Sequence, residues 1–252
     1  MGARATTRQR GGAVAVMPRR VVCLGDSITR GQLSADYVAM LSERTSLAPL
    51  EFTNAGVNGE LAENVLRRLA GIVELQPDVV TVLIGSNDVV ASMSAKSGAR
   101  ARRMNKLTGR PGIEGFADNV AAIVERLTRE TSARIGLLSL PVLGEDLGSA
   151  SVRRSQEYSA VLKKIAESDR VTYLPLNERQ VEYLTVGGFQ PCTHYRDNLA
   201  LMVGGAIQHF LLRRSLDDIS HRRGLQLTTD LLHQNTRGAT MIADLIEEFV
   251  AG

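Results

Sequence analysis

The sequence predicts an α/β fold in which a five-stranded parallel sheet is covered by helices on both faces. Five short apolar, β-rich runs are separated by segments in which apolar residues have helical spacing. Strands that alternate with helices favour a parallel sheet. The strands of such a sheet are buried on both faces and therefore read as continuous apolar runs. VVTVLIG at 79–85 is a run of this kind.

The strands are expected, in chain order, at residues 20–24, 50–53, 78–84, 134–140 and 170–174. Apolar residues recur every three or four positions between and after them, which is the spacing of a helix that buries one face. The helices are expected at residues 35–46, 60–75, 116–129, 151–168 and 236–250. Pro77 closes the second of these, because proline cannot continue a helix.

Two stretches do not fit the alternation and are predicted to be insertions. Residues 89–112 follow the third strand and have a loop-like, basic sequence. Residues 185–228 follow the fifth strand and include a helix at 198–214. Its apolar stripe is expected to pack as core, although AIQHFLLRR could instead cap a substrate pocket. Long structureless loops are uncommon, so local structure or a lid is expected in the second insertion.

The domain organisation expected from these patterns is one domain at 19–252 after a disordered arm at 1–18. The arm lacks a clear secretory signal, so a cytoplasmic location is expected, with secretion left open. The longest apolar run, 199–212, is too short for a membrane helix and is interrupted by Gln208 and His209. No integral membrane segment is therefore expected. No pattern in the sequence indicates the oligomeric state.

Charge and aromatic content argue against a nucleic-acid-binding protein. The net charge is +3 and the aromatic content is 4%. Arginines gather around residues 100–110, but aromatic side chains are not interleaved with them. A solvated basic face is therefore expected, with no nucleic-acid partner.

Three polar clusters directly follow the first three strands. They are GDS at 25–27, NAGVNG at 54–59 and GSND at 85–88. In open α/β sheets, ligands bind beyond the carboxyl ends of the strands, so these clusters are expected to share one edge of the sheet. A fourth cluster, DLLH at 230–233, precedes the last expected helix.

Together the clusters contain the groups that an acyl-transfer site needs. The hydroxyl of Ser27 is the candidate nucleophile, and it needs a base within hydrogen-bond reach. His233 is the candidate base, and Asp230 is the carboxylate that would orient it. The oxyanion that forms on attack needs fixed donors. The Ser27 N–H, the Gly59 N–H and the Asn87 side-chain amide are the candidates.

With these residues in this order, the sequence resembles the SGNH (GDSL-type) hydrolase superfamily over about residues 19–184 and 226–250. The matching blocks are GDSIT at 25–29, Gly59, GSND at 85–88 and DLLH at 230–233. The resemblance implies a flavodoxin-like three-layer α/β/α sandwich with strand order 2-1-3-4-5. It also implies an esterase or lipase with a serine nucleophile, a catalytic triad and an oxyanion hole, and without a metal or other cofactor.

The departures from the family pattern lie in the last block. The family often has Gly after the Asp and Pro after the His, where this chain has Leu231 and Gln234. In the second block, Gly56 is an alternative donor to Gly59. Gly56 is expected instead to be a turn glycine with positive φ.

Other polar residues of the clusters are expected to support the site. Asp26 would hold the first turn by hydrogen bonds, and Gly85 would support the third cluster. Asp88 is expected to cap or fix the loop of Asn87 and to bind no metal. His209 and His221, in the second insertion, are expected to be exposed or packed without a role.

No metal site is expected. Cys192, His194 and Asp197 form an incomplete ligand set, because a structural zinc site needs four N or S ligands. These residues are therefore expected to form a surface polar turn. Two cysteines make no disulfide framework, and Cys23 is expected in the core.

The function expected from the sequence is hydrolysis of carboxylic esters through an acyl-Ser27 intermediate. The substrate would be a small-molecule, lipid or carbohydrate ester. Two alternatives remain at this point: an O-acyltransferase that uses the same acyl-enzyme, and a ligand-binding module without catalysis. All of the expected site residues are present, whereas a degenerate site would be expected to lack Ser27, Asn87 or His233.

Overall fold

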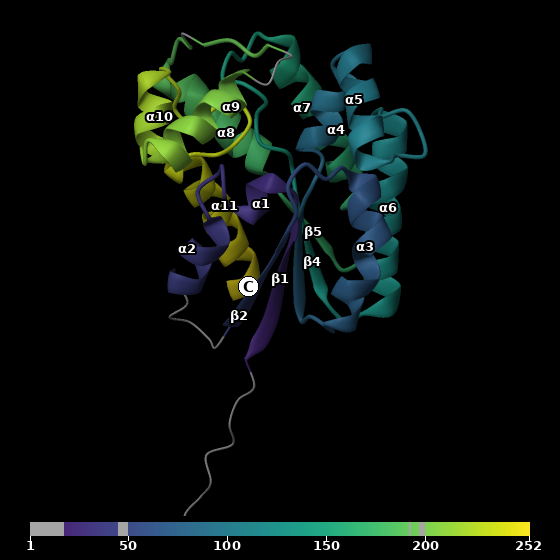
Figure 1. The fold of residues 1–252 in the computed structure, drawn as a ribbon. Coiled ribbons are helices and arrows are strands. Elements are labelled where there is room, and N and C mark those ends of the chain that lie inside the picture. Colours follow the sequence, from purple (N-terminus) through teal and green to yellow (C-terminus); the bar gives the residue numbers. More distant parts are fainter. Residues whose placement is uncertain (1–17, 45–49, 192, 197–199) are drawn as a thin grey trace, which may run out of the picture.

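The computed structural model describes residues 18–44, 50–191, 193–196 and 200–252. The residues expected to form the N-terminal arm, 1–17, lie outside the described part. A sheet of parallel strands in the order β2-β1-β3-β4-β5 forms the centre of the molecule (Figure 1). The strands are β1 (Arg19–Gly25), β2 (Leu50–Gly56), β3 (Val79–Leu83), β4 (Arg134–Leu138) and β5 (Val171–Leu174). The predicted flavodoxin-like sheet and its strand order are confirmed.

Helices cover both faces of the sheet, as predicted (Figure 1). One face carries α3 (Ala62–Glu74), α6 (Ile113–Glu130) and α7 (Ala150–Ile165). The other face carries α2 (Tyr37–Arg44), α8 (Leu176–Gly187) and α11 (Thr236–Ala251). The short helix α1 (Ser27–Arg30) follows β1 directly.

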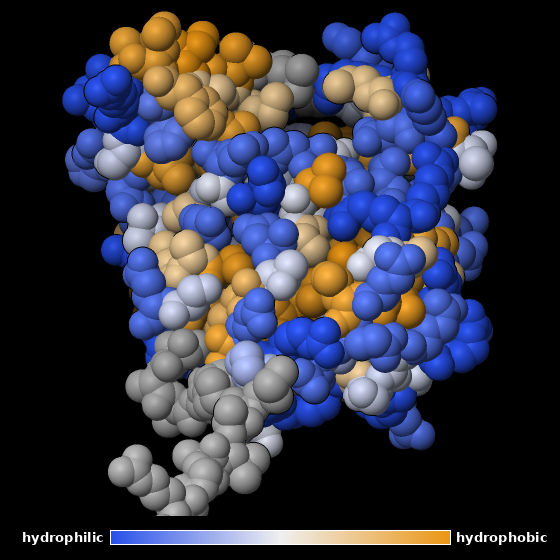
Figure 2. Space-filling model, turned by 60° about the horizontal axis from the view of Figure 1, so that its bottom comes forward, coloured by the Kyte–Doolittle hydropathy of each residue, from blue (hydrophilic) through white to orange (hydrophobic). Residues whose placement is uncertain are grey.

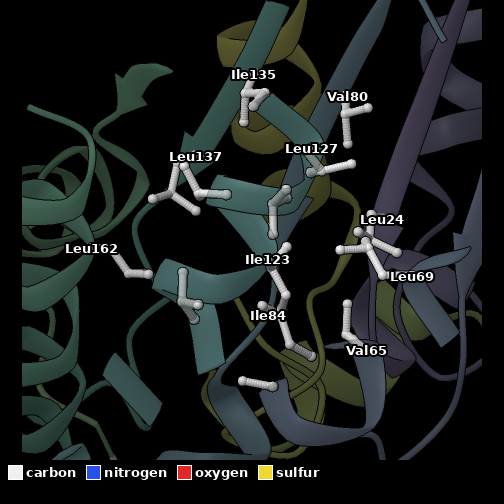
Figure 3. Close-up of a cluster of buried hydrophobic side chains, with 14 of the residues drawn as sticks. Leu24, Val65, Leu69, Val80, Ile84, Ile123, Leu127, Ile135, Leu137 and Leu162 are labelled. Carbon is white, nitrogen blue, oxygen red and sulfur yellow. The ribbon is translucent and has the colours of Figure 1, made fainter. Parts of the chain in front are cut away.

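Two apolar clusters attach these layers to the sheet. Figure 3 shows the larger one, in which Leu69 of α3 and Ile123 of α6 lie against strand residues such as Leu24, all of them fully buried. The second cluster lies on the other face and includes Cys23, buried as predicted, with Ile246 of α11. Burying one large aliphatic side chain contributes about 1.5–3 kcal/mol. The two clusters therefore fix the sheet that carries the polar edge.

The first predicted insertion is not a loop. Within residues 89–112, helix α4 (Ser86–Ser92) continues to its end and α5 (Ala95–Asn105) follows. Helix α5 starts where the Ser94 side chain accepts a hydrogen bond from the Ser97 N–H, at 3.0 Å. Ser97 is the one buried residue of α5. Such a helix buries no apolar stripe, so the periodicity that reveals a helix in sequence is absent.

The second insertion contains α9 (Ala200–Ala206), a π-helical turn η1 (Ile207–Leu211) and α10 (Leu216–Arg222). The predicted helix at 198–214 is thus confirmed in part, since 197–199 lie outside the described residues. The expectation that its apolar stripe packs as core is wrong, because Phe210 and Leu211 are exposed by 61% and 75%. No helix in the described part of the chain is both long enough and apolar enough to span a bilayer.

Candidate active site

Ser27 lies at the carboxyl end of β1, where an apolar strand gives way to a helix. The Asp26 side chain accepts a hydrogen bond from the Ile28 N–H at 2.9 Å and so caps α1, as expected for a turn-holding residue. Ser27 is the first residue of that helix and is 8% exposed. The strand therefore ends by holding a hydroxyl at the rim of the sheet.

The structure brings Ser27, His233 and Asp230 into one hydrogen-bonded line. The Ser27 Oγ lies 3.0 Å from the His233 Nε2, although the residues are 206 positions apart. The His233 Nδ1 lies 2.8 Å from the Asp230 Oδ2. A carboxylate accepts only, so Nδ1 carries the proton and donates it to Asp230. Nε2 is then free to accept the hydroxyl proton of Ser27.

Burial and pairing act in opposite directions on the two charged partners. Burial favours the neutral form of Asp230, but the adjacent His233 and three hydrogen bonds outweigh it and lower the pKa of the carboxyl below 3.8. Burial also favours neutral His233, yet the charge of Asp230 and their hydrogen bond raise the pKa of the imidazole above 6.5. The pair therefore stabilises an imidazolium, which is the state that forms when His233 takes a proton.

A buried carboxylate that the sequence did not single out holds the loop of Asp230 and His233. Glu145, in the loop after β4, is 3% exposed. Its Oε1 accepts hydrogen bonds from the Leu227 N–H, the Thr228 N–H and the Thr228 hydroxyl, at 2.8–2.9 Å. Its Oε2 accepts from the Gln226 N–H at 2.6 Å. No sequence motif indicates such a residue, because its partners, mainly backbone N–H groups, lie some 80 positions away in the chain.

The loop departs from the family pattern at a residue that adopts an unusual conformation. Leu231 has φ of 75°, in the left-handed region that favours glycine. Its side chain is 1% exposed, and its carbonyl accepts from the Gly144 N–H at 2.8 Å. Burial of the leucine side chain offsets the backbone strain. The neighbouring Gln234 is fully buried and its amide donates to the Leu232 carbonyl at 3.0 Å.

Two backbone donors predicted for the oxyanion lie at the same edge, the Ser27 N–H at the start of α1 and the Gly59 N–H in an exposed turn. The Val57 N–H donates to the Gly25 carbonyl at 3.1 Å, which joins the turn after β2 to the end of β1. Gly59 lies in that turn with φ of 76°, so the turn needs a residue that tolerates the left-handed region. Within the described residues, neither the Ser27 N–H nor the Gly59 N–H has a hydrogen-bond acceptor. Both are available to a ligand.

The third predicted donor, the Asn87 amide, is engaged inside the protein. Its Nδ2 donates to the Glu60 carbonyl at 3.0 Å and to the Asp26 Oδ2 at 3.3 Å. An oxyanion would have to replace the longer bond, the one to Asp26. Asn87 occupies the first turn of α4, which starts at Gly85. Gly85 has φ of 129°, and a Cβ there would lie 2.5 Å from the Phe116 ring, so only glycine fits.

Two expectations about neighbouring residues need correction. Gly56 does not have positive φ. It ends β2, and a Cβ there would lie 2.3 Å from the Arg30 nitrogen, so its constraint is close approach to α1. Asp88 does not fix a loop of Asn87, because both residues are in α4. Its Oδ2 instead accepts from the Ala62 N–H at 3.1 Å, at the start of α3.

Two buried acids below the site have raised pKa values. Burial is the main cause, and it raises the pKa of Asp26 to about 6 and that of Asp88 to about 8. The charge of His233 lowers the first, and Asp26 further raises the second. Asp26 in turn contributes to the raised pKa of His233. The charge of Asp26 therefore acts on both His233 and Asp88.

The residues considered for a metal are not brought together. Cys192 and Asp197 lie outside the described residues, and the His194 Nδ1 is 3.2 Å from the Asp146 Oδ2. In the described part of the chain, no group of three or more His, Cys, Asp or Glu side chains could hold a metal ion. His209 is half-buried and donates to the Arg214 carbonyl at 2.9 Å, while His221 is exposed.

A cavity of about 780 Å³ lies between the C-terminal end of α4 and helix α5. Its lining includes Ala91 and Leu107 together with four cations, Arg102, Arg103, Lys106 and Arg110. The basic residues noted around 100–110 therefore line a hollow. Ser27 is not part of its lining.

Solved structures with the same fold are esterases and hydrolases. They include an acetyl xylan esterase, AlAXEase, with a TM-score of 0.66 and 18% identity over 92% of this chain and 99% of that chain. A catalytic mutant of Axe2, an acetylxylan esterase from Geobacillus stearothermophilus, has a TM-score of 0.64 and 16% identity over 91% and 93%. LAE5, an alpha/beta hydrolase enzyme from the metagenome of Lake Arreo, Spain, has a TM-score of 0.62 and 20% identity over 92% and 94%. At these identities the likeness shows the fold.

The sequence itself carries the family assignment. The comparison with curated proteins gave no match. The family model of GDSL-like lipases and acylhydrolases matches residues 23–205, well over half of the chain. This range contains Ser27, Gly59 and Asn87. It ends before Asp230 and His233, which the fold places in hydrogen-bond contact with each other and, through His233, with Ser27. The chain therefore belongs to the GDSL-like lipase/acylhydrolase family and is a carboxylic ester hydrolase.

Proposed function

We propose that this hydrolase cleaves esters through a covalent acyl-Ser27 intermediate, with His233 as the general base and acid. The observation that carries the proposal is the hydrogen-bonded line from Ser27 Oγ through the imidazole to Asp230, with contacts of 3.0 and 2.8 Å. An activated serine needs a base within this reach and a third group that orients the base. Both conditions hold at a site that is almost fully buried.

In the proposed first half-reaction, Ser27 Oγ attacks the ester carbonyl carbon while its proton passes to His233 Nε2. The carbonyl oxygen becomes an oxyanion, which accepts hydrogen bonds from the Ser27 and Gly59 N–H groups and from Asn87. Donors that are fixed in advance at such a position usually supply the largest part of the stabilisation. His233 then gives its proton to the leaving alcohol, and the carbon–oxygen bond breaks.

In the second half-reaction, water takes the place of the alcohol. His233 Nε2 accepts a proton from water, whose oxygen attacks the acyl carbon, and the same donors hold the oxyanion. Breaking the bond to Ser27 Oγ releases the acid, and His233 returns the proton to Ser27. Asp230 stays ionised throughout and keeps the imidazole in the tautomer that accepts at Nε2.

Labelling by a fluorophosphonate probe tests the nucleophile. The probe requires an activated serine, so it should label the native chain and fail on Ser27→Ala. Ser27→Ala should also lower ester turnover by up to about 10⁶-fold, the loss typical of a deleted serine nucleophile, with an unchanged circular dichroism spectrum. The control is Ser168→Ala, which removes an exposed hydroxyl. Native turnover or labelling in Ser27→Ala would remove Ser27 from the mechanism.

The proposed substrates are lipid esters and acylated carbohydrates. The family description names lipases and acylhydrolases, and two of the similar structures are acetyl xylan esterases. A series of p-nitrophenyl esters from acetate to palmitate separates these classes. A maximum at acetate would favour small acyl groups on carbohydrates, and a maximum at long chains would favour lipids.

A further inference from the structure

The two polar side chains of the segment 200–212, formed by α9, η1 and Leu212, form hydrogen bonds with neighbouring residues of the chain. The Gln208 Nε2 donates to the Gly204 carbonyl at 3.1 Å, and the Gln208 Oε1 accepts from Arg214 at 2.9 Å. The His209 Nδ1 donates to the Arg214 carbonyl at 2.9 Å. Gln208 and His209 are thus hydrogen-bonded to Gly204 and Arg214, although both remain partly exposed.

The apolar side chains of the same segment face outward. Val203 and Ile207 are each 49% exposed, and Phe210, Leu211 and Leu212 are 61%, 75% and 55% exposed. Val203 and Ile207 are four positions apart, and Phe210, Leu211 and Leu212 follow at the end of the π-helical turn, so the exposed apolar residues recur along the whole segment. Figure 2 shows apolar side chains gathered at one upper corner of the molecule, over the region of α9 and α10 in Figure 1. An exposed apolar patch of this kind indicates an interaction surface.

The inner face of the segment attaches the patch to the active site. Gly204 and Gly205 lie against the guanidinium of Arg223, which a Cβ at either position would approach to 3.4 Å. Arg223 in turn donates to the Thr229 carbonyl at 2.6 Å, one residue before Asp230. The patch therefore lies at the same end of the molecule as Ser27 and is joined to the loop that carries its base.

The charges around the patch favour an anionic partner. The segment is followed directly by Arg213 and Arg214, and residues 200–214 include no acidic residue. Arg213 and Arg222 are exposed, and no ion pair or hydrogen bond of their side chains is found among the described residues. The acids nearest in sequence are Asp197 before this stretch and Asp217 after it, and Asp217 accepts hydrogen bonds from Thr236.

We propose that the face formed by Val203, Ile207 and 210–213 docks on the surface of an anionic lipid layer. A helix with an apolar face that includes an aromatic residue and is flanked by arginine is the type that lies in such an interface. A second copy of the chain fits this face less well. A two-fold pairing would place the Arg213 side chains of both copies in one interface, and residues 200–214 contain no acid to neutralise them. The docking itself does not depend on catalysis. The consequence that lipid esters reach Ser27 from this surface rests on the proposed function.

Co-sedimentation with vesicles tests the docking. Vesicles of phosphatidylcholine with 30% phosphatidylglycerol are compared with vesicles of phosphatidylcholine alone, using the full chain and its Ser27→Ala variant. Binding should favour the anionic vesicles in both forms. Phe210→Ser with Leu211→Ser should weaken binding about tenfold or more. Arg213→Gln should weaken binding to anionic vesicles about fivefold.

Met104→Ser is the matched control, since Met104 is 70% exposed and belongs to α5. It should bind vesicles as the native chain does, and all of these surface variants should hydrolyse p-nitrophenyl acetate at the native rate. Failure of the native chain to bind anionic vesicles would overturn the proposal. So would unchanged binding by the Phe210 and Leu211 variant, or a native dimer in light scattering that this variant converts to monomer. Binding by Ser27→Ala separates docking from catalysis.

Discussion

Two regions at the same end of the molecule place polar and apolar groups in opposite ways. Around Ser27, the polar side chains of Asp230, His233 and Glu145 are at most 8% exposed and are hydrogen-bonded to one another or to backbone. In the segment 200–212, large apolar side chains are exposed and the polar ones bond to Gly204 and Arg214. In the first region the buried polar side chains find their partners within the chain. The second region leaves apolar surface in water, which is the observation behind the proposed docking surface.

The largest expected effect that separates the two regions comes from Asp230→Asn. An asparagine in place of the orienting carboxylate disturbs the tautomer of the histidine and typically costs about 10⁴-fold in kcat. His233 acts as a base only when unprotonated, and the charge of Asp230 raises its pKa above 6.5. Native activity should therefore fall as the pH drops through that raised pKa. The acid limb of the variant should move to lower pH.

The measurement is kcat/KM for a soluble ester from pH 5 to 9. Asp169→Asn, which alters an exposed carboxylate, is the control and should leave the profile unchanged. Vesicle binding by Asp230→Asn should equal that of the native chain. A loss of binding together with activity would show that the two regions are one functional unit.

A smaller effect is expected from Asn87→Ala. Loss of one oxyanion donor typically lowers kcat by about 10²–10³-fold with little change in KM. Asn87 also donates to Asp26 and Glu60 in the free enzyme, so the unfolding free energy should fall as well. Steady-state kinetics and urea denaturation report the two effects separately. Native kcat in the variant would leave only the backbone donors at the oxyanion.

Stability measurements sharpen the comparison further. Ile123→Ala removes a fully buried side chain from the larger cluster and should cost about 2–5 kcal/mol of unfolding free energy. Phe210→Ser removes a ring that is 61% exposed and should change stability by no more than about 0.5 kcal/mol. Urea denaturation measures both. A cost for Phe210→Ser that approaches the core value would mean that this residue stabilises the fold.

The last effect, which is seen only as a change of stability with pH, concerns Asp88, whose pKa is raised to about 8 from 3.8. Between these values the unfolded chain ionises the carboxyl and the folded chain does not. The folded state therefore loses stability as pH rises from about 4 to about 8, by at most about 1.4 kcal/mol per pH unit. Asp88→Asn keeps an acceptor for the Ala62 N–H and removes this titration. Its stability relative to the native chain should rise from pH 5 to pH 8, while that of Asp169→Asn stays constant.

Sequence reasoning predicted most where burial leaves a periodic trace. The five strands and the helices α2, α3, α6, α7 and α11 are predictable because their buried residues recur at fixed spacing. Helix α5 was missed because it buries only Ser97, and α8 because buried Asn177 and Gln180 interrupt its apolar pattern. The stripe of 198–214 has helical spacing, but spacing alone cannot tell whether the apolar face meets the core or the solvent.

The site shows the same division. Ser27, Gly59, Asn87, Asp230 and His233 were selected because each belongs to a short motif at the end of an expected element. Glu145 belongs to no motif, since its role depends on backbone groups brought near it by the fold. The shared edge of Asn87 and Asp26 follows from the strand ends, but the hydrogen bond between them does not, because it depends on how the two side chains are oriented in the packed structure.

The hydrogen bond from Arg223 to the Thr229 carbonyl limits how much of the second insertion can be exchanged with that of a related hydrolase. Ser220 donates to the Thr228 carbonyl and accepts from Asn235, so α10 is fastened to the stretch that leads into the imidazole. A segment exchanged between relatives should therefore end before Ser215, although the insertion was expected to extend to residue 228. A chimera with a later boundary would also replace α10 and would lose the hydrogen bonds that hold the loop of His233 in place.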